Sequence, residues 1–314
     1  RRMIAKTITL IESRLVSHQQ AAFNIMEHVL PNTGNSLRLG ITGIPGVGKS
    51  TFIENLGVLL ANKGHNVAVL AVDPSSRRSG GSILGDKTRM EKLSVHENAF
   101  IRPSPTGETL GGVAAKTREI MLICEAAGFD VILVETVGVG QSETEVASMV
   151  DFFLVLMIAG AGDELQGIKK GVLELADGIA INKADMDNLQ AVAAAKKDLE
   201  TAMHRIRPES PNWSTPVMTC SSITDGGTKD VWEKILEHSR ITKKSGEFDK
   251  RRKDQSIEWM WAQVEDGLKR YFRENEMIGK QIPVVSRQVA DGKLSATVAA
   301  KELLSYLQVN NENT

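Results

Sequence analysis

The sequence predicts an α/β fold built on a mostly parallel β-sheet with helices on both faces. Short apolar runs bounded by turn residues alternate with stretches of helical spacing, the pattern of strands that are buried on both sides. Both ends of the chain show helical spacing without strands. This predicts helices before the first strand and after the last strand of the sheet. A hydrophobic content of 41% and a charged content of 25% are typical of a globular protein.

The elements follow in order along the chain. Apolar positions from Ile11 to Leu30 predict helices that end near Pro31. The predicted strands are Leu37–Thr42, Val67–Val72, Val131–Glu135, Phe152–Ile158, Gly178–Ile181 and Pro216–Cys220. The predicted helices between them are Lys49–Asn62, Gly112–Ala127, Leu165–Leu175 and Asn188–His204.

The strands stop after Gly226-Gly227. Residues 229–238 look helical, and Ser245-Gly246 forms a break that is followed by the charged run Lys250–Asp254. Further helices are predicted after that break, the last beginning near Ser295. Residues Ile257, Trp261, Val264, Leu268 and Phe272 recur at helical spacing. Such a stripe either packs on its own domain or forms a subunit interface.

The composition excludes several classes of protein. A formal net charge of −1 over 314 residues gives no basic field for nucleic acid or an anionic membrane surface. No apolar run reaches the roughly 18 residues of a membrane span. Cys124 and Cys220 are too few for a disulfide framework, so we expect a reducing compartment. Without a visible targeting segment we expect the cytoplasm, or the mitochondrial matrix for a eukaryotic source, although the chain can start inside a longer product.

The strongest functional signal runs from Gly43 to Thr51 and matches the phosphate-binding pattern G-x-x-x-x-G-K-[ST]. It lies between a predicted strand and a predicted helix, which separates a P-loop from a chance glycine-rich turn. In such a loop the backbone N–H groups and the helix N-terminus bind phosphate, Lys49 adds a mobile charge, and Ser50 offers a hydroxyl to Mg²⁺. The predicted nucleotide-binding residues here are Gly43, Gly46, Val47, Gly48, Lys49, Ser50 and Thr51.

A second signal is the apolar strand that ends at Glu135. A carboxylate is expected at the end of the strand next to a P-loop, where it serves the Mg²⁺ site. Gly138 follows three residues later, where its N–H is placed to contact the γ-phosphate. The alternative is a solvated acid at a strand end.

A third signal is Asn182-Lys183-Ala184-Asp185, which matches the N-K-x-D guanine pattern. A buried Asp185 would accept hydrogen bonds from N1–H and the exocyclic amine of guanine, and adenine would leave it unpaired. Lys183 would lie along the base plane. Ser221, after the last predicted strand, is a candidate second base contact.

Two further acids and one loop have two interpretations each. Asp73 and Asp86 are candidate Mg²⁺ ligands, directly or through water, or else loop and capping residues. The glycine-rich stretch 159–171 is either a loop that orders with nucleotide or partner, or a simple connection from strand to helix.

These motifs together resemble the MeaB/ArgK-type P-loop GTPases, a family that includes the human protein associated with methylmalonic aciduria type A. The resemblance covers nearly the whole chain. It rests on Gly43–Thr51, Ala71–Ser76, Gly80–Met90, Glu135–Glu143, Gly162–Gly171, Asn182–Asp185, Arg251–Trp261 and Gln281-Ile282-Pro283.

The resemblance implies an N-terminal helical extension (1–35), a P-loop GTPase domain (36–226) and a C-terminal helical dimerisation arm (227–314). It also implies slow, Mg²⁺-dependent hydrolysis of GTP to GDP, with Lys49 and Glu135 among the catalytic residues. The implied Mg²⁺ and phosphate residues are Lys49, Ser50, Asp73, Asp86 and Glu135. Lys169, in a loop similar to the family's extra switch, is the residue expected to move to the nucleotide.

The implied function is that of a homodimeric chaperone of adenosylcobalamin-dependent methylmalonyl-CoA mutase, which protects the enzyme and gates cofactor loading. Neither nucleic acid nor a membrane is an expected partner.

The sequence departs from the family pattern at one place, where Gly107-Glu108 replaces an Arg-Gly pair found in many members. The alternatives are an ATPase or kinase of lysine, arginine and ornithine transport, and a scaffold whose hydrolysis is incidental. A nickel chaperone is disfavoured, since the sequence has no His-rich tract or paired Cys motif.

Overall fold

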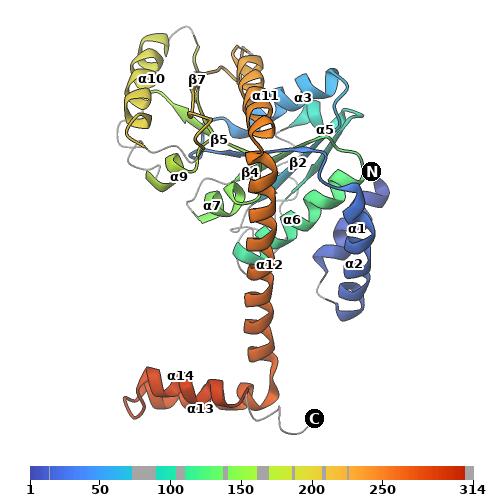
Figure 1. Cartoon of the computed structure of the whole chain (residues 1–314), viewed down its shortest axis with the longest axis vertical. Coiled ribbons are helices and arrows are strands. Elements are labelled where there is room, and N and C mark those ends of the chain that lie inside the picture. Colours follow the sequence, from blue (N-terminus) through green and yellow to red (C-terminus); the bar gives the residue numbers. More distant parts are fainter. Residues whose placement is uncertain are drawn as a thin grey trace. The chain divides into compact units, whose positions relative to one another are not determined.

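The computed structural model describes residues 1–13, 15–72, 90–103, 110–136, 141–160, 170–185, 188–206, 210–224 and 226–307. Its described strands form one seven-stranded parallel sheet with the order β3-β2-β4-β1-β5-β6-β7 (Figure 1). The strands are β1 Leu37–Thr42, β2 Val67–Val72, β3 Ala99–Arg102, β4 Val131–Thr136, β5 Phe152–Ile158, β6 Gly178–Asn182 and β7 Val217–Thr219. The predicted fold class is therefore confirmed.

Helices connect the strands and occupy both ends of the chain. Those before β5 are α1 Arg2–Glu12, α2 Val16–Val29, the short 3₁₀ helix η1 Leu30–Asn32, α3 Lys49–Asn62, α5 Glu91–Val95, α6 Leu110–Ala126 and α7 Gln141–Ala147. Those after it are α9 Lys170–Glu174, α10 Leu189–Met203, α11 Thr228–Ser245, α12 Glu247–Glu274, α13 Glu276–Ala290 and α14 Ala296–Ser305.

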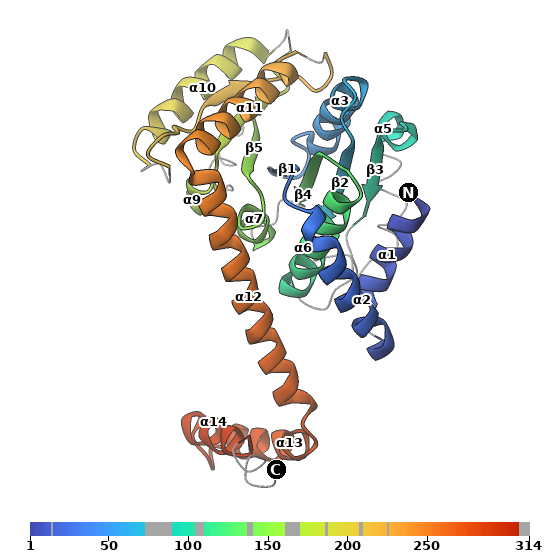
Figure 2. The same ribbon diagram turned by 45° about the vertical axis from the view of Figure 1, so that its right-hand side comes forward.

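The sheet separates two apolar cores, because successive residues of a strand point to opposite faces. In β4, Ile132 and Val134 join the core beneath α6 and α1, whereas Val131 and Leu133 join the core beneath α3 and α11. Helices α1 and α2 both contact α6 (Figure 2). The N-terminal helices are thus part of the first core rather than a detached appendage.

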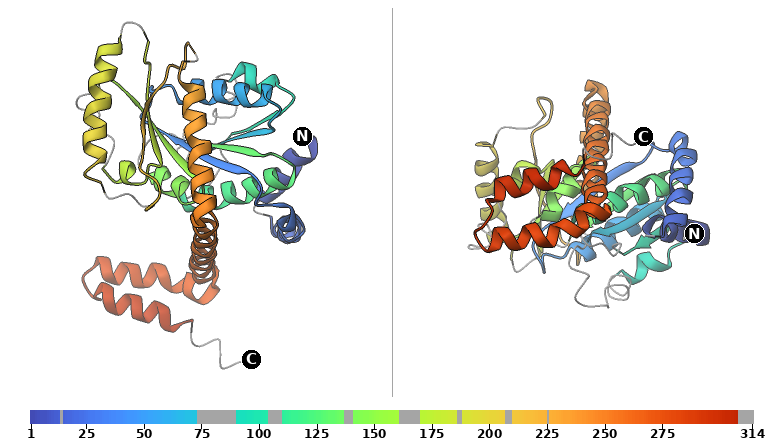
Figure 3. Two further views of the ribbon diagram at one scale, coloured as in Figure 1. Left: turned by 45° about the horizontal axis from the view of Figure 1, so that its top comes forward. Right: turned by 90° about the horizontal axis from the view of Figure 1, so that it is seen from below.

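The chain divides into two compact units, residues 1–255 and 256–314. The second unit contains the end of α12 and the neighbouring helices α13 and α14 (Figure 3). Gly292, at φ 69°, lies in the turn between α13 and α14, and Ser295 caps α14 by accepting a hydrogen bond from the Val298 N–H. No helix in the described ranges is long and apolar enough to cross a membrane.

Several elements differ from the sequence prediction, among them the short helices α5 and α7, which were not predicted. Strand β3 was not predicted, because Ala99–Arg102 is only four residues long and lies at the edge of the sheet. The charged run Lys250–Asp254 lies within α12, which begins directly after Gly246 and thus well before the predicted stripe at Ile257. Gly246 itself ends α11 with φ 80°, in agreement with the predicted break at Ser245-Gly246.

Candidate nucleotide-binding site

The phosphate-binding loop connects the central strand β1 to helix α3. Gly48 has φ 97° and precedes the first helical residue, Lys49. A Cβ atom at Gly48 would lie 2.6 Å from Nδ2 of Asn182. A side chain here would therefore be strained by the backbone and blocked by its neighbour. The loop leads directly into α3, whose N-terminus carries the positive end of the helix dipole.

Lys49 is buried and folds back over this loop. Its Nζ donates to the carbonyl oxygens of Gly43, at 2.6 Å, and Ile44, at 3.2 Å. The ammonium is thus hydrogen-bonded although only 8% of the residue is exposed. A phosphate oxygen in the loop would compete with these carbonyl groups for the same cation, so the arrangement fits an anion at this place.

The hydroxyl of Ser50 donates to a carboxylate oxygen of Glu135 at 3.0 Å. Ser50 is the second residue of α3, and Glu135 is opposite Ile41 of the neighbouring β1. Both groups offer oxygen, the ligand atom that Mg²⁺ takes in proteins, so these two residues fit part of a magnesium site. The other predicted members of this region, Asp73, Asp86, Gly138 and Lys169, lie outside the described residues.

The Asn182 side chain joins the predicted base-binding motif to the phosphate loop. Its Nδ2 donates to the carbonyl oxygen of Val47 at 2.8 Å. Its Oδ1 accepts from the backbone N–H of Ser222 at 3.0 Å and from the Ser222 hydroxyl at 2.9 Å. Asn182 is completely buried, so the carboxamide is held in one orientation.

Asp185 and Ser221, predicted separately to contact the base, lie together. The Ser221 hydroxyl donates to the Asp185 carboxylate, and the N–H of Ala184 donates to the carbonyl oxygen of Cys220 at 3.0 Å. Between Asn182 and Asp185 the chain passes through Lys183 at φ 58°, a left-handed conformation that is uncommon for a residue with a side chain. Unusual backbone of this kind is found at binding sites. The Lys183 side chain is exposed.

The remaining predicted nucleotide contacts differ in burial. Val47 is completely buried, and it is its carbonyl oxygen that takes part in the site. Thr51 is exposed on α3. The sequence prediction missed Ser222 and Asn55, which donates from Nδ2 to the Ser222 carbonyl at 2.6 Å. No sequence pattern pairs these two residues, because they are 167 positions apart.

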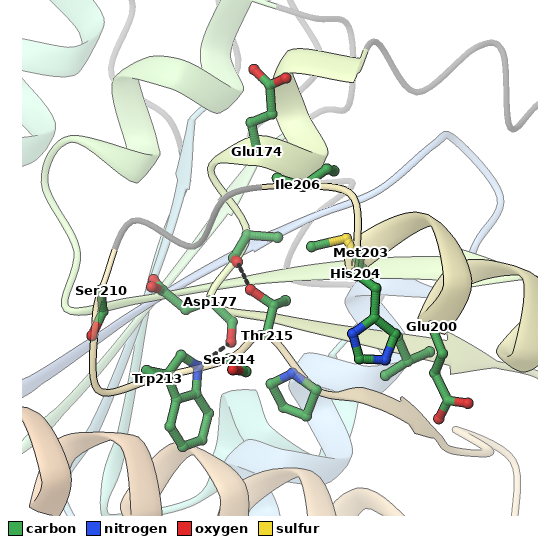
Figure 4. A pocket seen from close by; sticks show the side chains of 13 residues that line it. Glu174, Asp177, Glu200, Met203, His204, Ile206, Ser210, Trp213, Ser214 and Thr215 are labelled. Atoms are coloured by element: carbon green, nitrogen blue, oxygen red, sulfur yellow. Dashed lines mark hydrogen bonds between the residues drawn. The ribbon is translucent and has the colours of Figure 1, made fainter.

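A separate cavity of about 440 Å³ lies at the opposite end of the sheet (Figure 4). It is lined by residues just before β6 and β7, including Asp177 and Thr215, and by the end of α10. Trp213 donates to the carbonyl oxygen of Asp177, and Thr215 donates to that of Ala176, both at 2.8 Å. The phosphate loop and the base motif lie at the carboxyl ends of the strands instead, where open α/β sheets bind ligands.

Comparison with known proteins places the chain in a family. A GTPase of Escherichia coli strain K12, named ArgK, is 47% identical over 98% of this chain and 93% of its own length. The mouse protein named methylmalonic aciduria type A homolog, mitochondrial, is 43% identical over 97% of this chain and 76% of its own length. A crystal structure described as a LAO/AO transport system kinase has a TM-score of 0.78 and 41% identity, and covers 98% of this chain and 93% of that chain.

The family model described as methylmalonyl-CoA mutase-associated GTPase MeaB matches residues 4–277. A protein of Caulobacter vibrioides that is named as a GTPase is 54% identical over 97% of this chain and 93% of its own length. The chain thus belongs to the MeaB family of methylmalonyl-CoA mutase-associated GTPases, and it is a GTPase.

Proposed function

We propose that this GTPase is Mg²⁺-dependent and acts as a chaperone of an adenosylcobalamin-dependent methylmalonyl-CoA mutase, protecting it and gating the loading of its cofactor. The observation that carries the mutase proposal is the family match over residues 4–277. The name of the mouse relative, which refers to methylmalonic aciduria, supports it further. The proposed location is the cytoplasm, or the mitochondrial matrix for a eukaryotic source.

The proposed chemistry is in-line attack of water on the γ-phosphate of GTP. Lys49 exchanges its hydrogen bonds to the Gly43 and Ile44 carbonyls for phosphate oxygens and neutralises the charge that develops there. Ser50 and Glu135, which are hydrogen-bonded to each other, provide oxygen ligands for the metal next to the phosphate site. Mg²⁺, when bound, supplies further charge neutralisation at the phosphate oxygens. Asp73 and Asp86 are proposed as additional magnesium ligands, and Gly138 as a γ-phosphate contact.

Intrinsic hydrolysis is proposed to be slow and to be stimulated by the mutase through Lys169. The test measures GTP hydrolysis by the purified chain with and without a purified adenosylcobalamin-dependent methylmalonyl-CoA mutase. We expect the mutase to raise the rate, and Lys169→Ala to remove most of that stimulation while Lys170→Ala retains it. Fast hydrolysis by the chain alone, with no effect of the mutase, would contradict the proposal. Removing Mg²⁺ with a chelator should abolish hydrolysis in both cases.

The structural relative described as a transport system kinase gives a second candidate function, phosphate transfer to a protein of amino-acid transport. Incubation with γ-labelled GTP or ATP and a basic amino-acid binding protein separates the two. Label in inorganic phosphate supports transfer to water, as in a GTPase, whereas label on the binding protein supports the kinase.

A homodimer formed through the C-terminal arm is part of the proposal. In the second unit, Ile257, Trp261 and Leu268 are each more than half exposed and share one face of α12. A continuous apolar stripe of this kind is typical of a helix that packs against another surface. We expect Trp261→Asp to shift the mass measured by light scattering from dimer to monomer. Asp266→Asn, on the opposite face of the helix, should leave the mass unchanged.

A further inference from the structure

We infer that Asn55 is a positioning residue for guanine recognition, which sets the base-binding loop relative to the phosphate-binding loop. Asn55 lies on α3 and belongs to neither nucleotide motif. The inference rests on the proposed assignment of Asp185 and Ser221 to the guanine base.

A closed ring of hydrogen bonds carries the inference. Asn55 Nδ2 donates to the Ser222 carbonyl at 2.6 Å. Ser222 donates through its N–H and its hydroxyl to Oδ1 of Asn182, and Asn182 Nδ2 donates to the Val47 carbonyl. Val47 lies in the phosphate loop, and that loop leads into α3, which returns the ring to Asn55. Hydrogen bonds thus connect three segments that are distant in the sequence: the phosphate loop with α3, the end of β6 at Asn182, and the loop at Ser222.

Burial gives the ring a single arrangement. Asn182 and Val47 are completely buried and Ser222 is 6% exposed, so little water is available to replace a lost partner. A flipped Asn182 carboxamide would place its NH₂ group against the Ser222 N–H and remove the donor from the Val47 carbonyl. The bonds that Asn182 makes to Ser222 and Val47 therefore require one another in the observed orientation, which is the condition for a rigid polar network.

The peptide bond between Ser221 and Ser222 connects this ring of hydrogen bonds to the residues proposed to recognise the base. Ser221 precedes Ser222, and its hydroxyl donates to Asp185. The same hydroxyl oxygen accepts from the N–H of Ile223 at 3.3 Å and of Thr224 at 3.2 Å. These bonds fix the Ser221 side chain to the backbone of its own loop, so the two move together. A shift of the Ser222 carbonyl therefore moves the hydroxyl that orients Asp185.

This geometry assigns different tasks to the start and the middle of α3. Its first residues, Lys49 and Ser50, belong to the phosphate site, whereas Asn55 holds the loop that lies next to Asp185. The helix thus acts as a spacer between the place of the phosphates and the place of the base. Loss of the Asn55 hydrogen bond should weaken recognition of the base and leave phosphate binding intact.

The test compares Asn55→Leu, which removes the donor at similar volume, with wild type in the full chain. Calorimetry measures the affinities for GDP, IDP and inorganic pyrophosphate. IDP lacks the exocyclic amine that Asp185 is proposed to bind, and pyrophosphate has no base. We expect Asn55→Leu to weaken GDP binding about tenfold, the effect of losing roughly one hydrogen bond. We also expect a smaller GDP-to-IDP affinity ratio and unchanged pyrophosphate affinity.

Two further variants sharpen the test. Asn55→Gln keeps the amide donor and should restore part of the GDP-to-IDP ratio. Asn62→Leu removes another amide from α3, one that contacts His96, and should leave all three affinities unchanged.

Equal losses of GDP and pyrophosphate affinity in Asn55→Leu would mean that the substitution disturbs α3 as a whole. No loss of either affinity would mean that Asn55 does not position the base-binding loop. Both results overturn the inference while leaving the guanine assignment in place. A wild-type chain that binds GDP and IDP equally would overturn the Asp185 assignment itself, and the inference with it.

Discussion

Arg252 donates two hydrogen bonds of 2.7 Å to the carboxylate of Asp151, joining the beginning of α12 to the residue before β5. Asp151 is 3% exposed and also accepts from the backbone N–H of Arg38 at 2.8 Å. The same guanidinium donates to the carbonyl oxygens of Gly34 and Ser36. One buried ion pair therefore gathers three distant segments at the amino ends of β1 and β5.

Replacing Arg252 with Met should destabilise the protein by about 3–5 kcal/mol, because it leaves the buried Asp151 charge without its partner. Urea unfolding followed by circular dichroism measures the change. The control is Lys250→Met, which removes a solvent-exposed pair with Asp254 and should change the stability much less. Equal effects of the two substitutions would mean that the Arg252 pair contributes no more than a surface pair.

The Glu125 carboxyl should make the stability depend on acid pH. Burial by itself raises the pKa of Glu125, but hydrogen bonds and charge from Arg38, with hydrogen bonds from Ser36 and Gly34, hold the pKa below its ordinary value of 4.5. The ionised form is thus favoured in the folded state. Its contribution is present above pH 4.5 and is lost as the pH falls through the lower, folded pKa.

We therefore expect the difference in unfolding free energy between wild type and Glu125→Gln to be greatest near neutral pH and to shrink steadily below pH 4.5. Urea titrations across that range measure it. Glu119→Gln, on the same helix but in a pair with Lys116, is the control. A pH-independent difference between wild type and Glu125→Gln would contradict the assigned cause.

His238 should act in a different pH range. Burial lowers the pKa of His238, and the Asp177 carboxylate, which raises it, does not outweigh burial together with the Arg251 charge, which lowers it. The neutral ring is thus favoured in the folded state, packed between Phe152 and Trp213 with centroids 5.1 and 5.0 Å away. The unfolded chain binds the proton first, so wild type should lose stability as the pH falls below about 6.5.

His238→Gln should lack this loss of stability below about pH 6.5, since glutamine does not titrate. Melting temperatures recorded between neutral and mildly acidic pH test the point. His28→Gln, at an exposed histidine of α2, should keep the wild-type profile. Parallel profiles of wild type and His238→Gln would show that the histidine does not titrate in the way described.

Gly48→Ala should weaken nucleotide binding more than a similar substitution elsewhere. The new methyl group would lie 2.6 Å from Asn182 Nδ2 and displace the side chain that holds the Val47 carbonyl. Gly64→Ala is the matched control, because Gly64 has a similar φ of 88° but no atom within 4 Å of a new Cβ. Calorimetry with GDP should show a loss of at least about tenfold for Gly48→Ala only. Equal affinities would contradict the role of this contact.

Asp185→Asn should change the preferred base. The amide cannot accept both guanine hydrogen bonds, but its NH₂ can donate to the additional carbonyl oxygen of xanthine. We expect lower affinity for GDP and higher affinity for XDP, measured by competition with a fluorescent guanine nucleotide. Unchanged GDP binding would mean that Asp185 does not contact the base.

Much of the fold was predictable because its signals are local. The boundaries of β1, β2 and β5 and of α3 agree with the sequence prediction, since each is a continuous apolar or helical run closed by turn residues. Helix α13 was harder to predict because Pro283, ordinarily a helix breaker, lies inside it. The start of α12 was also hard to predict, because no local pattern shows that Arg251 and Arg252 in its charged run pair with Asp177 and Asp151.

The nucleotide motifs were likewise visible in the sequence, because each is a short pattern whose spacing is set by the backbone geometry that phosphate or guanine requires. The sequence by itself thus determined the parallel sheet, the phosphate loop and the residues expected to read the base. Only the tertiary structure decided that Asn182 turns toward Val47, that Asn55 holds Ser222 and that Arg252 meets Asp151. These partners are between 101 and 167 positions apart, and hydrogen-bond partners across such separations are chosen by the packing of the sheet and not by any local pattern.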